Sequence, residues 1–495
     1  HKIKISKKEL LKIKSNMSTV FGIAHRIREH INLKLKTYPF KTDELAIINA
    51  ILLGQRQDID ENVYKSYTNA GAVHILAISG LHIGIILLLL STLLKPLEKF
   101  RKGLLLKTII LVLILWSFAV IAGLSASVTR AVTMFSIVAI SMHLKRPTNI
   151  YNTLAISVFI LLLFKPLFLF DVGFQLSYLA VIGIVSVDPY LYRLWIPKNW
   201  LLRKYWHTFT VTISAQLGII PISIFYFNQF PGLFFISNLI IIPVLGLILG
   251  LGILVILLAI LNILPDFIAV LFGKSISLMN SVVGWVSNQE AFLIKDISFT
   301  LLYVLGCYLF IVGLTRFLIK KNFYRLLFFL VSIIICQGIF IFNKFEIPRN
   351  EFLIFHKSRY SMIGKVKPNQ LILYNNLDSI AKNKDRTVRD FLVETHISQL
   401  KEDTLRNVYQ FQDKTILVID SLGIYNLKKI RPDAVLIRNS PKINLIRVID
   451  SLNPKIIIAD GSNYKSYTNR WHKTCKQKNI LFHYTGTQGA FILNN

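Results

Sequence analysis

The chain has few cysteines, few acidic residues and no ATP-binding motif. Its three cysteines cannot build a disulfide framework, and Cys307 and Cys336 lie in apolar runs that suit small buried side chains. The sequence lacks a Walker-type G-x-x-x-x-G-K-[ST] motif, which argues against an ATP motor within this chain. No secretory signal peptide is visible at the start, and because the chain begins with His1 we expect a truncated N-terminus.

Apolar residues, in contrast, are abundant and grouped. Hydrophobic residues make up 53% of the 495, and the mean hydropathy is +0.53. They lie in long runs separated by short loops, and roughly 20 apolar residues cross about 30 Å of hydrocarbon as a helix. The sequence therefore predicts a polytopic membrane protein. The formal net charge of +31 suits membrane topology, anionic lipid or a polyanion, and does not choose among them.

The apolar runs divide the chain into four regions. Residues 1–38 are polar and basic and are expected to end a truncated extracytoplasmic domain, and residues 39–73 read as amphipathic helices too polar to span. Residues 74–343 are the predicted transmembrane domain, and 344–495 the predicted extracytoplasmic tail. About ten membrane helices are predicted, near residues 74–94, 108–123, 130–143, 150–164, 171–187, 207–227, 233–262, 267–287, 298–315 and 326–343.

The run at 233–262 is longer than one span requires. It contains Pro243 and several glycines, so it predicts either one kinked helix or two shorter pieces. Pro221 and Pro231 lie just before it and also favour broken helices. Membranes tolerate such breaks where the freed backbone lines a cavity or packs on protein.

Basic residues are shared unequally between the two sides that ten alternating spans define. The loops of one side carry fifteen lysines and arginines, and those of the other carry two, Lys165 and Lys295. The positive-inside rule places the basic side in the cytoplasm and both termini outside it. The basic side comprises loops 95–107, 144–149, 188–206, 263–266 and 316–325, and the other side comprises 124–129, 165–170, 228–232 and 288–297.

The tail alternates short apolar stretches with polar helical ones. "TILVID", "DAVLIRN" and "KIIIAD" are typical of buried strands, which predicts a small α/β domain. The predicted fold class is thus an α-helical polytopic membrane protein with a small α/β extracytoplasmic C-terminal domain.

Polar residues interrupt one predicted membrane helix at "HILAISGLHIG". His74, Ser79, Gly80 and His82 stand there, and Ser79 and His82 share a helix face at a spacing of three. Polar groups are costly within the membrane and usually face the bundle interior or water, so these residues are candidates for a pore lining. The alternative is that Ser79 and Gly80 permit close helix packing and the histidines satisfy nearby acceptors.

Arg130 follows in "GLSASVTRA", at the start of another apolar run. An arginine at mid-bilayer costs roughly 2.5–3.5 kcal/mol on insertion scales. It is a candidate for a cation at the pore mouth that meets phosphate, or it simply snorkels to the helix end.

Further polar residues follow in two later apolar segments. "DVGFQLSYLAVIG" holds Asp171, Gln175 and Ser177, and positions 171 and 175 share one helix face, although an aspartate at a helix start can also serve only as an N-cap. Gln216 and Asn238 lie farther along and complete the candidates for a polar path.

These residues belong to four segments whose order and spacing, over roughly residues 40–290, resemble the competence domain of the ComEC family of DNA-internalisation proteins. The segments are "LLGQRQDIDENVYKSYTNAGAVHILAISGLHIG", "GLSASVTRAVTM", "PLFLFDVGFQLSYLAVIGI" and "AQLGIIPIS…NLIIIP". The resemblance implies a membrane channel that passes single-stranded DNA across the cytoplasmic membrane during natural transformation. It implies no cofactor. The implied partners are single-stranded DNA, the lipid bilayer, a cytoplasmic motor or single-strand-binding protein and an extracytoplasmic DNA receptor.

Many members of this family end in a metallo-β-lactamase-like domain with a metal motif of the H-x-H-x-D-H kind, which this tail lacks. Arg438, Asn439 and Ser440 stand where a metal-binding histidine pair is expected. The resemblance therefore implies a degenerate, non-nucleolytic tail, and no enzyme activity. A weaker alternative, because His-x2-Cys alone is a poor signal, is a residual metal site from Asp460, His472, Cys475 and His483.

Two other classes of function stay open. A small-solute or lipid transporter would be favoured by inverted repeats, and none is visible. An intramembrane serine protease is suggested by Ser79 beside histidines, but a base on the same helix is poorly placed to activate it.

Overall fold

The computed structural model describes residues 19–143, 149–345, 350–378, 385, 387–395, 397, 399–425 and 431–493. The first part of the predicted basic N-terminal segment, the predicted basic loop residues Lys145 and Arg146, and His396 of the tail lie outside the described residues. The chain divides into two compact units, one of residues 1–297 with 304–332 and one of residues 298–303 with 333–495.

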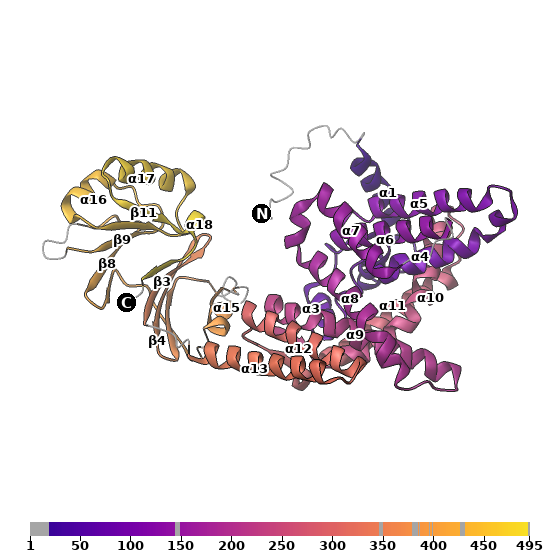
Figure 1. Cartoon of the computed structure of the whole chain (residues 1–495). Coiled ribbons are helices and arrows are strands. Elements are labelled where there is room, and N and C mark those ends of the chain that lie inside the picture. The colour runs from indigo at the N-terminus through magenta and orange to yellow at the C-terminus, as the bar shows by residue number, and fades with distance from the viewer. Residues whose placement is uncertain are drawn as a thin grey trace. The chain divides into compact units, whose positions relative to one another are not determined.

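The first unit is built almost entirely of helices (Figure 1). The helices up to the end of the apolar region are α1 (Val20–Leu35), α2 (Thr42–Leu53), α3 (Glu61–Asn69), α4 (Gly80–Leu93), α5 (Gly103–Ile121), α6 (Ala126–His143), α7 (Ile150–Phe164), α8 (Val172–Arg193), α9 (Trp200–Phe227), α10 (Phe234–Ile260), α11 (Asp266–Ser287), α12 (Leu301–Ile319) and α13 (Phe323–Phe345). Short 3-10 turns lie at Lys95–Lys99, Pro166–Phe170 and Glu290–Phe292, and β1 (Gln229–Pro231) pairs antiparallel with β2 (Leu293–Lys295).

Seven helices within the described residues are long and apolar enough to cross a membrane, namely α5 and α8 to α13. Helices α4, α6 and α7 are apolar but shorter. Large apolar side chains point outward from several of them, with exposed fractions of 68% for Phe159, 64% for Leu247 and 66% for Leu278. Such a surface suits lipid and not water. The predicted mostly helical fold, with several helices able to span a membrane, is therefore confirmed.

Helix α10 decides whether the long apolar run at 233–262 forms one kinked helix or two shorter pieces. It is one continuous helix from Phe234 to Ile260 that contains Pro243, and α9 likewise continues through Pro221. The breaks predicted at Pro221 and Pro243 are therefore wrong, whereas Pro231 does lie in a break, in β1 between α9 and α10. Ten of the 27 residues of α10 are buried, and this packing on neighbouring helices compensates for the backbone hydrogen bond that proline removes.

Helix α2 also differs from the prediction that residues 39–73 form amphipathic helices. Residues 46–53 are all buried, and Ile47, Ile48 and Ile51 share one core with side chains of α10 and α11. A helix that is enclosed on all sides has no solvent-exposed face. Apolar residues therefore surround it on every side and do not form a single stripe. Its 12 residues make about 18 Å, too short to span.

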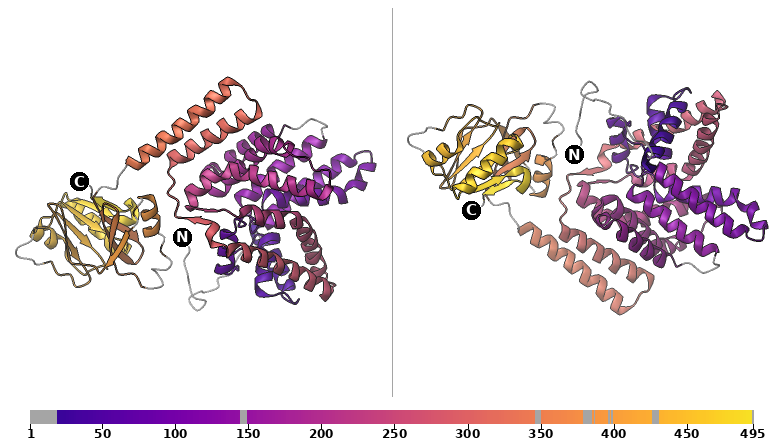
Figure 2. Two further views of the ribbon diagram at one scale, coloured as in Figure 1. Left: turned by 90° about the horizontal axis from the view of Figure 1, so that it is seen from below. Right: turned by 90° about the horizontal axis from the view of Figure 1, so that it is seen from above.

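Helices α8 and α9 form a long antiparallel hairpin held by two glycines. A Cβ on Gly183 would overlap the carbonyl oxygen of Ser214, and a Cβ on Gly218 would overlap that of Leu179. The two backbones therefore approach as closely as glycine permits, which is how membrane helices gain packing contacts without a hydrophobic driving force. The helices α12 and α13 also lie side by side (Figure 2), and Phe317 stacks on Phe329 with ring centroids 6.0 Å apart.

The second unit contains two five-stranded sheets, with strand orders β11-β10-β9-β8-β7 and β12-β3-β4-β5-β6. The strands are β3 (Glu351–Lys357), β4 (Tyr360–Lys367), β5 (Gln370–Asn375), β6 (Gln399–Asp403), β7 (Val408–Phe411), β8 (Lys414–Ile419), β9 (Ala434–Ile437), β10 (Ile456–Ala459), β11 (Leu481–Tyr484) and β12 (Phe491–Leu493). The helices are α15 (Thr387–Glu394), α16 (Leu445–Leu452), α17 (Lys465–Gln477) and α18 (Thr485–Gln488). The strands predicted from "TILVID", "DAVLIRN" and "KIIIAD" are thus confirmed as β8, β9 and β10.

Alternation along the central strands explains why the sheets stack. In β8, Leu417 and Ile419 face α16 and α17, whereas Ile416 and Val418 face the other sheet. Helix α15 packs on the far face of that second sheet through Val388. The unit is therefore layered as helices, sheet, sheet and helix, and Figure 1 shows α16 and α17 over the sheet that contains β8, β9 and β11.

The glycine contact of the hairpin gives a first prediction. Gly183→Ala forces the backbones of α8 and α9 apart, and overpacking of this kind costs about 1–3 kcal/mol. We expect a lower thermal midpoint for the whole chain in detergent. The control is Gly284→Ala on α11, where a Cβ would meet no atom within 4 Å. Equal midpoints for the two variants would contradict the close approach.

Candidate functional site

The polar stretch around Ser79 forms a helix start and not the middle of a helix. Helix α4 begins at Gly80, Ser79 has the extended backbone angles φ −106° and ψ 173°, and His74 is exposed in the turn before it. The Ser79 N–H donates to Nδ1 of His82 at 3.2 Å, and the Ser79 Oγ lies 2.8 Å from the same nitrogen. The predicted helix at 74–94 is therefore wrong at its beginning, because these groups cap the chain there.

Arg130 lies in the second turn of α6 and is only 3% exposed. Its Nη1 donates to the backbone oxygen of Ser177 at 3.1 Å, and its guanidinium carbon lies 5.5 Å from the ring centroid of Tyr178. On its other side, a Cβ added to Gly80 would come within 2.9 Å of Nη2. Arg130 is therefore enclosed by α4, α6 and α8, and the expectation that it might snorkel to the helix end is wrong.

The charge of Arg130 has no anionic partner among the described residues. Among the residues that the structure describes, no carboxylate lies within ion-pairing distance of the Arg130 guanidinium, and its Nε is buried without a hydrogen-bond partner. The Nε2 of buried His82 is also unpartnered. A buried cation without a counter-charge is costly, and an ionisable group within a membrane unit is a functional-site candidate for that reason.

The surroundings of Arg130 add further positive potential. Helices α4, α6 and α8 all begin on the side of the bundle where the guanidinium contacts Gly80 and Ser177. A helix N-terminus carries roughly half a positive charge. The Asp171 carboxylate at the N-cap of α8 offsets this charge at one helix, so the starts of α4 and α6 are the ones that favour an anion beside Arg130.

Of the ten predicted path residues, Gly80 and Ser177 contact Arg130, and Ser79 and His82 contact each other at the helix start beside Gly80. Tyr178 was missed, although its ring faces the guanidinium and its hydroxyl lies 2.9 Å from the Oγ of Ser157. No motif in the sequence marks Tyr178 or Ser157, because a tyrosine and a serine are ordinary residues in an apolar helix.

The other five residues do not contact Arg130. Asp171 is the N-cap of α8 and accepts from the Phe174 N–H at 2.9 Å. Gln175 accepts from the Tyr226 hydroxyl at 3.0 Å and so ties α8 to α9. Asn238 is buried in α10 with an unpartnered Oδ1, Gln216 is half-buried in α9, and His74 is exposed.

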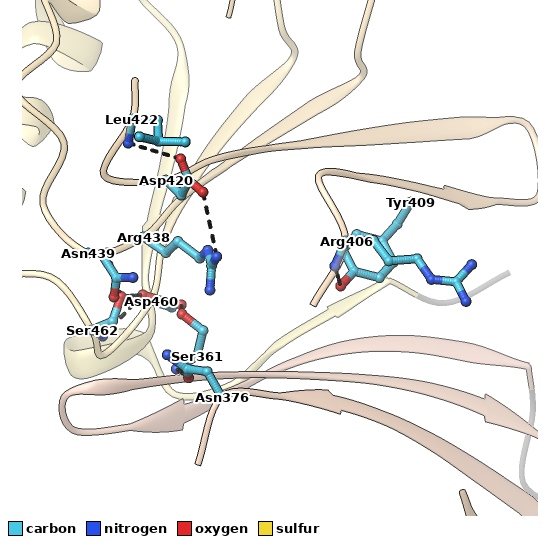
Figure 3. Close-up of polar contacts among 10 residues, drawn as sticks. All are labelled: Ser361, Asn376, Arg406, Tyr409, Asp420, Leu422, Arg438, Asn439, Asp460 and Ser462. Atoms are coloured by element: carbon cyan, nitrogen blue, oxygen red, sulfur yellow. Dashed lines mark hydrogen bonds and ion pairs between the residues drawn. The ribbon is translucent and has the colours of Figure 1, made fainter. Parts of the chain in front are cut away.

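The second unit has a polar cluster of its own where parallel strands end (Figure 3). Asp420 follows β8, Arg438 follows β9 and Asp460 follows β10, and Nη2 of Arg438 lies 3.6 Å from Oδ2 of Asp420. Asn439 has a φ of 55° and donates its N–H to the Oγ of Ser462 at 2.8 Å. The carboxyl edge of the sheet is therefore closed by an ion pair and hydrogen bonds.

Asp460 is buried at the centre of this cluster. It accepts hydrogen bonds from the hydroxyls of Ser361, in β4 of the other sheet, and Ser462, both at 2.5 Å. Burial raises the pKa of the Asp460 carboxyl, although both serines favour its charged form. The carboxylate thus joins the two sheets.

The residual metal site is wrong. Within the described part of the chain, no group of three His, Cys, Asp or Glu residues could hold a metal ion. Cys475 is buried in the core beneath α17, His472 stacks on Phe482 at 5.5 Å, and His483 contacts the backbone oxygen of Gly489. Each of these side chains has a separate structural role.

The segments of the sequence that carry the family resemblance pack on one another in the first unit. A Cβ on Gly54 would lie 2.7 Å from the carbonyl oxygen of Ala122, Gly80 contacts Arg130, and Arg130 contacts Ser177. A family model described as "Competence protein" matches residues 51–320, which is 270 of the 495 residues. The chain belongs to the competence protein family. A second family model, the ComEC C-terminal domain, matches residues 352–495, so the resemblance to the ComEC family is confirmed.

This chain is similar in sequence to one curated protein, ComE operon protein 3 of Bacillus subtilis (strain 168). The two are 29% identical over 217 residues, which covers 44% of this chain and 26% of the relative. The chain therefore aligns with about a quarter of that protein's length. No solved structure matches the chain.

The buried thiol gives a second prediction for this competence protein. Burial raises the pKa of Cys475 to about 12, so at pH 8 only about one thiol in 10⁴ is ionised and reactive. We expect maleimide to label Cys475 only after unfolding, in a chain that carries Cys307→Ser and Cys336→Ser. The control carries Ser466→Cys with Cys475→Ala, since Ser466 is exposed on the same helix, and it should label at once. Fast labelling of folded Cys475 would contradict its place in the core.

Proposed function

We propose that the chain is the membrane channel through which single-stranded DNA crosses the cytoplasmic membrane in natural transformation, with Arg130 near the outer end of its path. The observation that carries this proposal is the buried Arg130 guanidinium, which no carboxylate of the described part of the chain pairs with. A phosphodiester supplies one negative charge per nucleotide, and arginine is well suited to phosphate oxygens. Membership of the competence protein family supports DNA as the substrate.

The proposed topology has ten crossings, with α4, α6 and α7 spanning despite their length. Helices α4, α6 and α8 then start outside and end at the basic loops in the cytoplasm, which agrees with the positive-inside rule. Arg130 and its neighbours lie at the outer end of this arrangement. Both the N-terminal segment and the tail are extracytoplasmic in this proposal.

Transport in this direction works against the membrane potential. Each phosphate that crosses the full potential costs roughly 2.3 kcal/mol per 100 mV, before counterions screen it. One arginine at the outer end favours the first phosphates but cannot supply that work for a strand. A cytoplasmic motor or single-strand-binding protein is therefore a proposed partner, and an extracytoplasmic receptor is proposed to deliver the DNA.

The tail is proposed to be non-nucleolytic. Asp420, Arg438 and Asp460 stand at the strand ends, and they are engaged with one another or with serines. An arginine that pairs with a carboxylate in this position opposes a divalent cation, because like charges repel. We propose that the chain itself is not an enzyme.

One contact favours the protease alternative, since the Oγ of Ser79 lies within hydrogen-bond reach of His82. The contact is explained by the helix cap, so Ser79→Ala should cost about 1 kcal/mol of stability and leave DNA import largely intact. An essential nucleophile would instead lose activity completely while the protein remained folded. Import by the Ser79→Ala strain, measured together with its protein level, separates the two. The transporter alternative predicts altered solute or lipid content in a deletion strain.

The test of the channel is cytoplasmic import of labelled DNA in cells whose only copy is wild type or variant. Arg130→Gln removes the charge and should reduce import about tenfold or more, on the scale of a lost charged hydrogen bond. Arg130→Lys, which keeps the charge, should retain more. The control is Lys165→Gln, another cation of the proposed outer side that lies beside Phe168. Unchanged import by Arg130→Gln at equal protein level would sink the proposal.

A further inference from the structure

The basic end of the α8–α9 hairpin carries an open cavity of about 330 Å³. Tyr192 near the end of α8 and Trp200, Arg203, Lys204 and His207 of α9 line it. The volume lies at the lower end of the usual range for small-ligand pockets, roughly 300–1,000 Å³. The cavity lies at the other end of α8 from Ser177, where α8 contacts Arg130. It is therefore separate from the proposed DNA path.

The length of α9 sets the depth of this cavity. Its 28 residues extend about 42 Å at 1.5 Å per residue. Hydrocarbon takes up about 30 Å of that, so roughly eight residues project beyond it. When the far end of α9, at Phe227, lies at the other boundary, Trp200 to His207 lie at the level of the lipid headgroups.

Many large apolar side chains around the cavity are exposed on the surface of the chain, which is unfavourable in water. Seven large apolar or aromatic residues in this stretch have exposed fractions of 40–75%. They are Leu194, Trp195, Ile196, Trp200, Leu201, Leu202 and Tyr205. Tryptophan and tyrosine gather at membrane interfaces, where one end of the ring is apolar and the other wet. The hairpin end therefore lies within the interface.

Two cations face the cavity without carboxylate partners. Arg203 is oriented by the bond from its Nε to the backbone oxygen of Pro197 at 3.2 Å, and the Nζ of Lys204 lies 5.7 Å from the Trp200 ring centroid. Asp188 of α8 lies beside His207, with its Oδ2 3.6 Å from Nε2 of His207 and its Oδ1 buried without a hydrogen-bond partner. Among the described residues neither Arg203 nor Lys204 forms an ion pair, so an anion from outside the chain would complete the site.

We propose that this cavity binds the phosphate headgroup of an anionic phospholipid. Two oriented cations supply the charge, the indole of Trp200 supplies an apolar wall, and the exposed apolar side chains around them contact acyl chains. These apolar neighbours favour a lipid over a nucleic acid. A nucleic acid could pair its phosphates with the two cations, but it has no acyl chains to cover Leu194 and Ile196. The inference does not depend on what crosses the channel.

The test is native mass spectrometry of the full chain in detergent, titrated with phosphatidylglycerol and with phosphatidylcholine of the same acyl chains. Wild type is expected to prefer phosphatidylglycerol. A basic residue near an anionic surface is worth about a fivefold change in affinity, so Arg203→Gln with Lys204→Gln should weaken phosphatidylglycerol binding about 25-fold. Lys204→Gln alone keeps the Arg203–Pro197 contact and should weaken it about fivefold.

The matched control is Lys320→Gln with Lys321→Gln, an adjacent exposed basic pair in the loop between α12 and α13. It should bind both lipids as wild type does. An equal loss in this control, no loss in the double variant, or no preference in wild type would overturn the proposal. A third arm adds a 12-nucleotide oligothymidylate. If the oligonucleotide displaces the lipid and its own binding weakens in the double variant, the cavity is a nucleic-acid site and the lipid proposal fails.

Discussion

Arg130 keeps its charge within the membrane unit because backbone and aromatic groups replace water around it. The Ser177 oxygen accepts from Nη1, and the Tyr178 ring lies beside the guanidinium. These contacts provide polarity without cancelling the charge, since no carboxylate of the described chain pairs with it. The starts of α4, α6 and α8 must therefore stay together, and the packing of the first unit depends on that requirement.

Glycine makes this arrangement possible. Gly80 leaves room for the guanidinium, and Gly54 brings the end of α2 against the carbonyl of Ala122. In the hairpin of α8 and α9, Gly183 and Gly218 likewise allow the two helix backbones to touch. Small residues at helix contacts are typical of membrane bundles, where dispersion forces and hydrogen bonds take the place of the hydrophobic effect. Close approaches at glycine thus hold several helix pairs of the first unit together, and Gly80 gives the buried Arg130 its room.

The sequence predicted the positions of the apolar helices well, because an uninterrupted apolar run leaves few alternatives. It failed where neighbours decide the outcome. Pro243 favoured a break, but the surroundings of α10 keep that helix continuous. Insertion scales give the cost of placing an arginine at a given depth in the membrane, and they say nothing of its neighbours. The burial of Arg130 could therefore not be predicted from the sequence. In the tail, the apolar strands were predicted, whereas the contacts of His472 with Phe482 and of His483 with Gly489 emerged only from the structure.

Helix α9 is longer than a typical hydrocarbon layer is thick, and this excess has a consequence of its own. In a thicker bilayer the cations at its basic end would be drawn toward the acyl chains, and the hairpin would resist by straightening or by thinning the lipid around it. In a thinner bilayer it would tilt. Each response costs a fraction of a kcal/mol per Å of mismatch. Because α8 is locked to α9 by glycine contacts, hydrophobic mismatch at one end reaches the helix that holds Ser177 and Tyr178. Membrane thickness thereby becomes a variable that acts on the surroundings of Arg130.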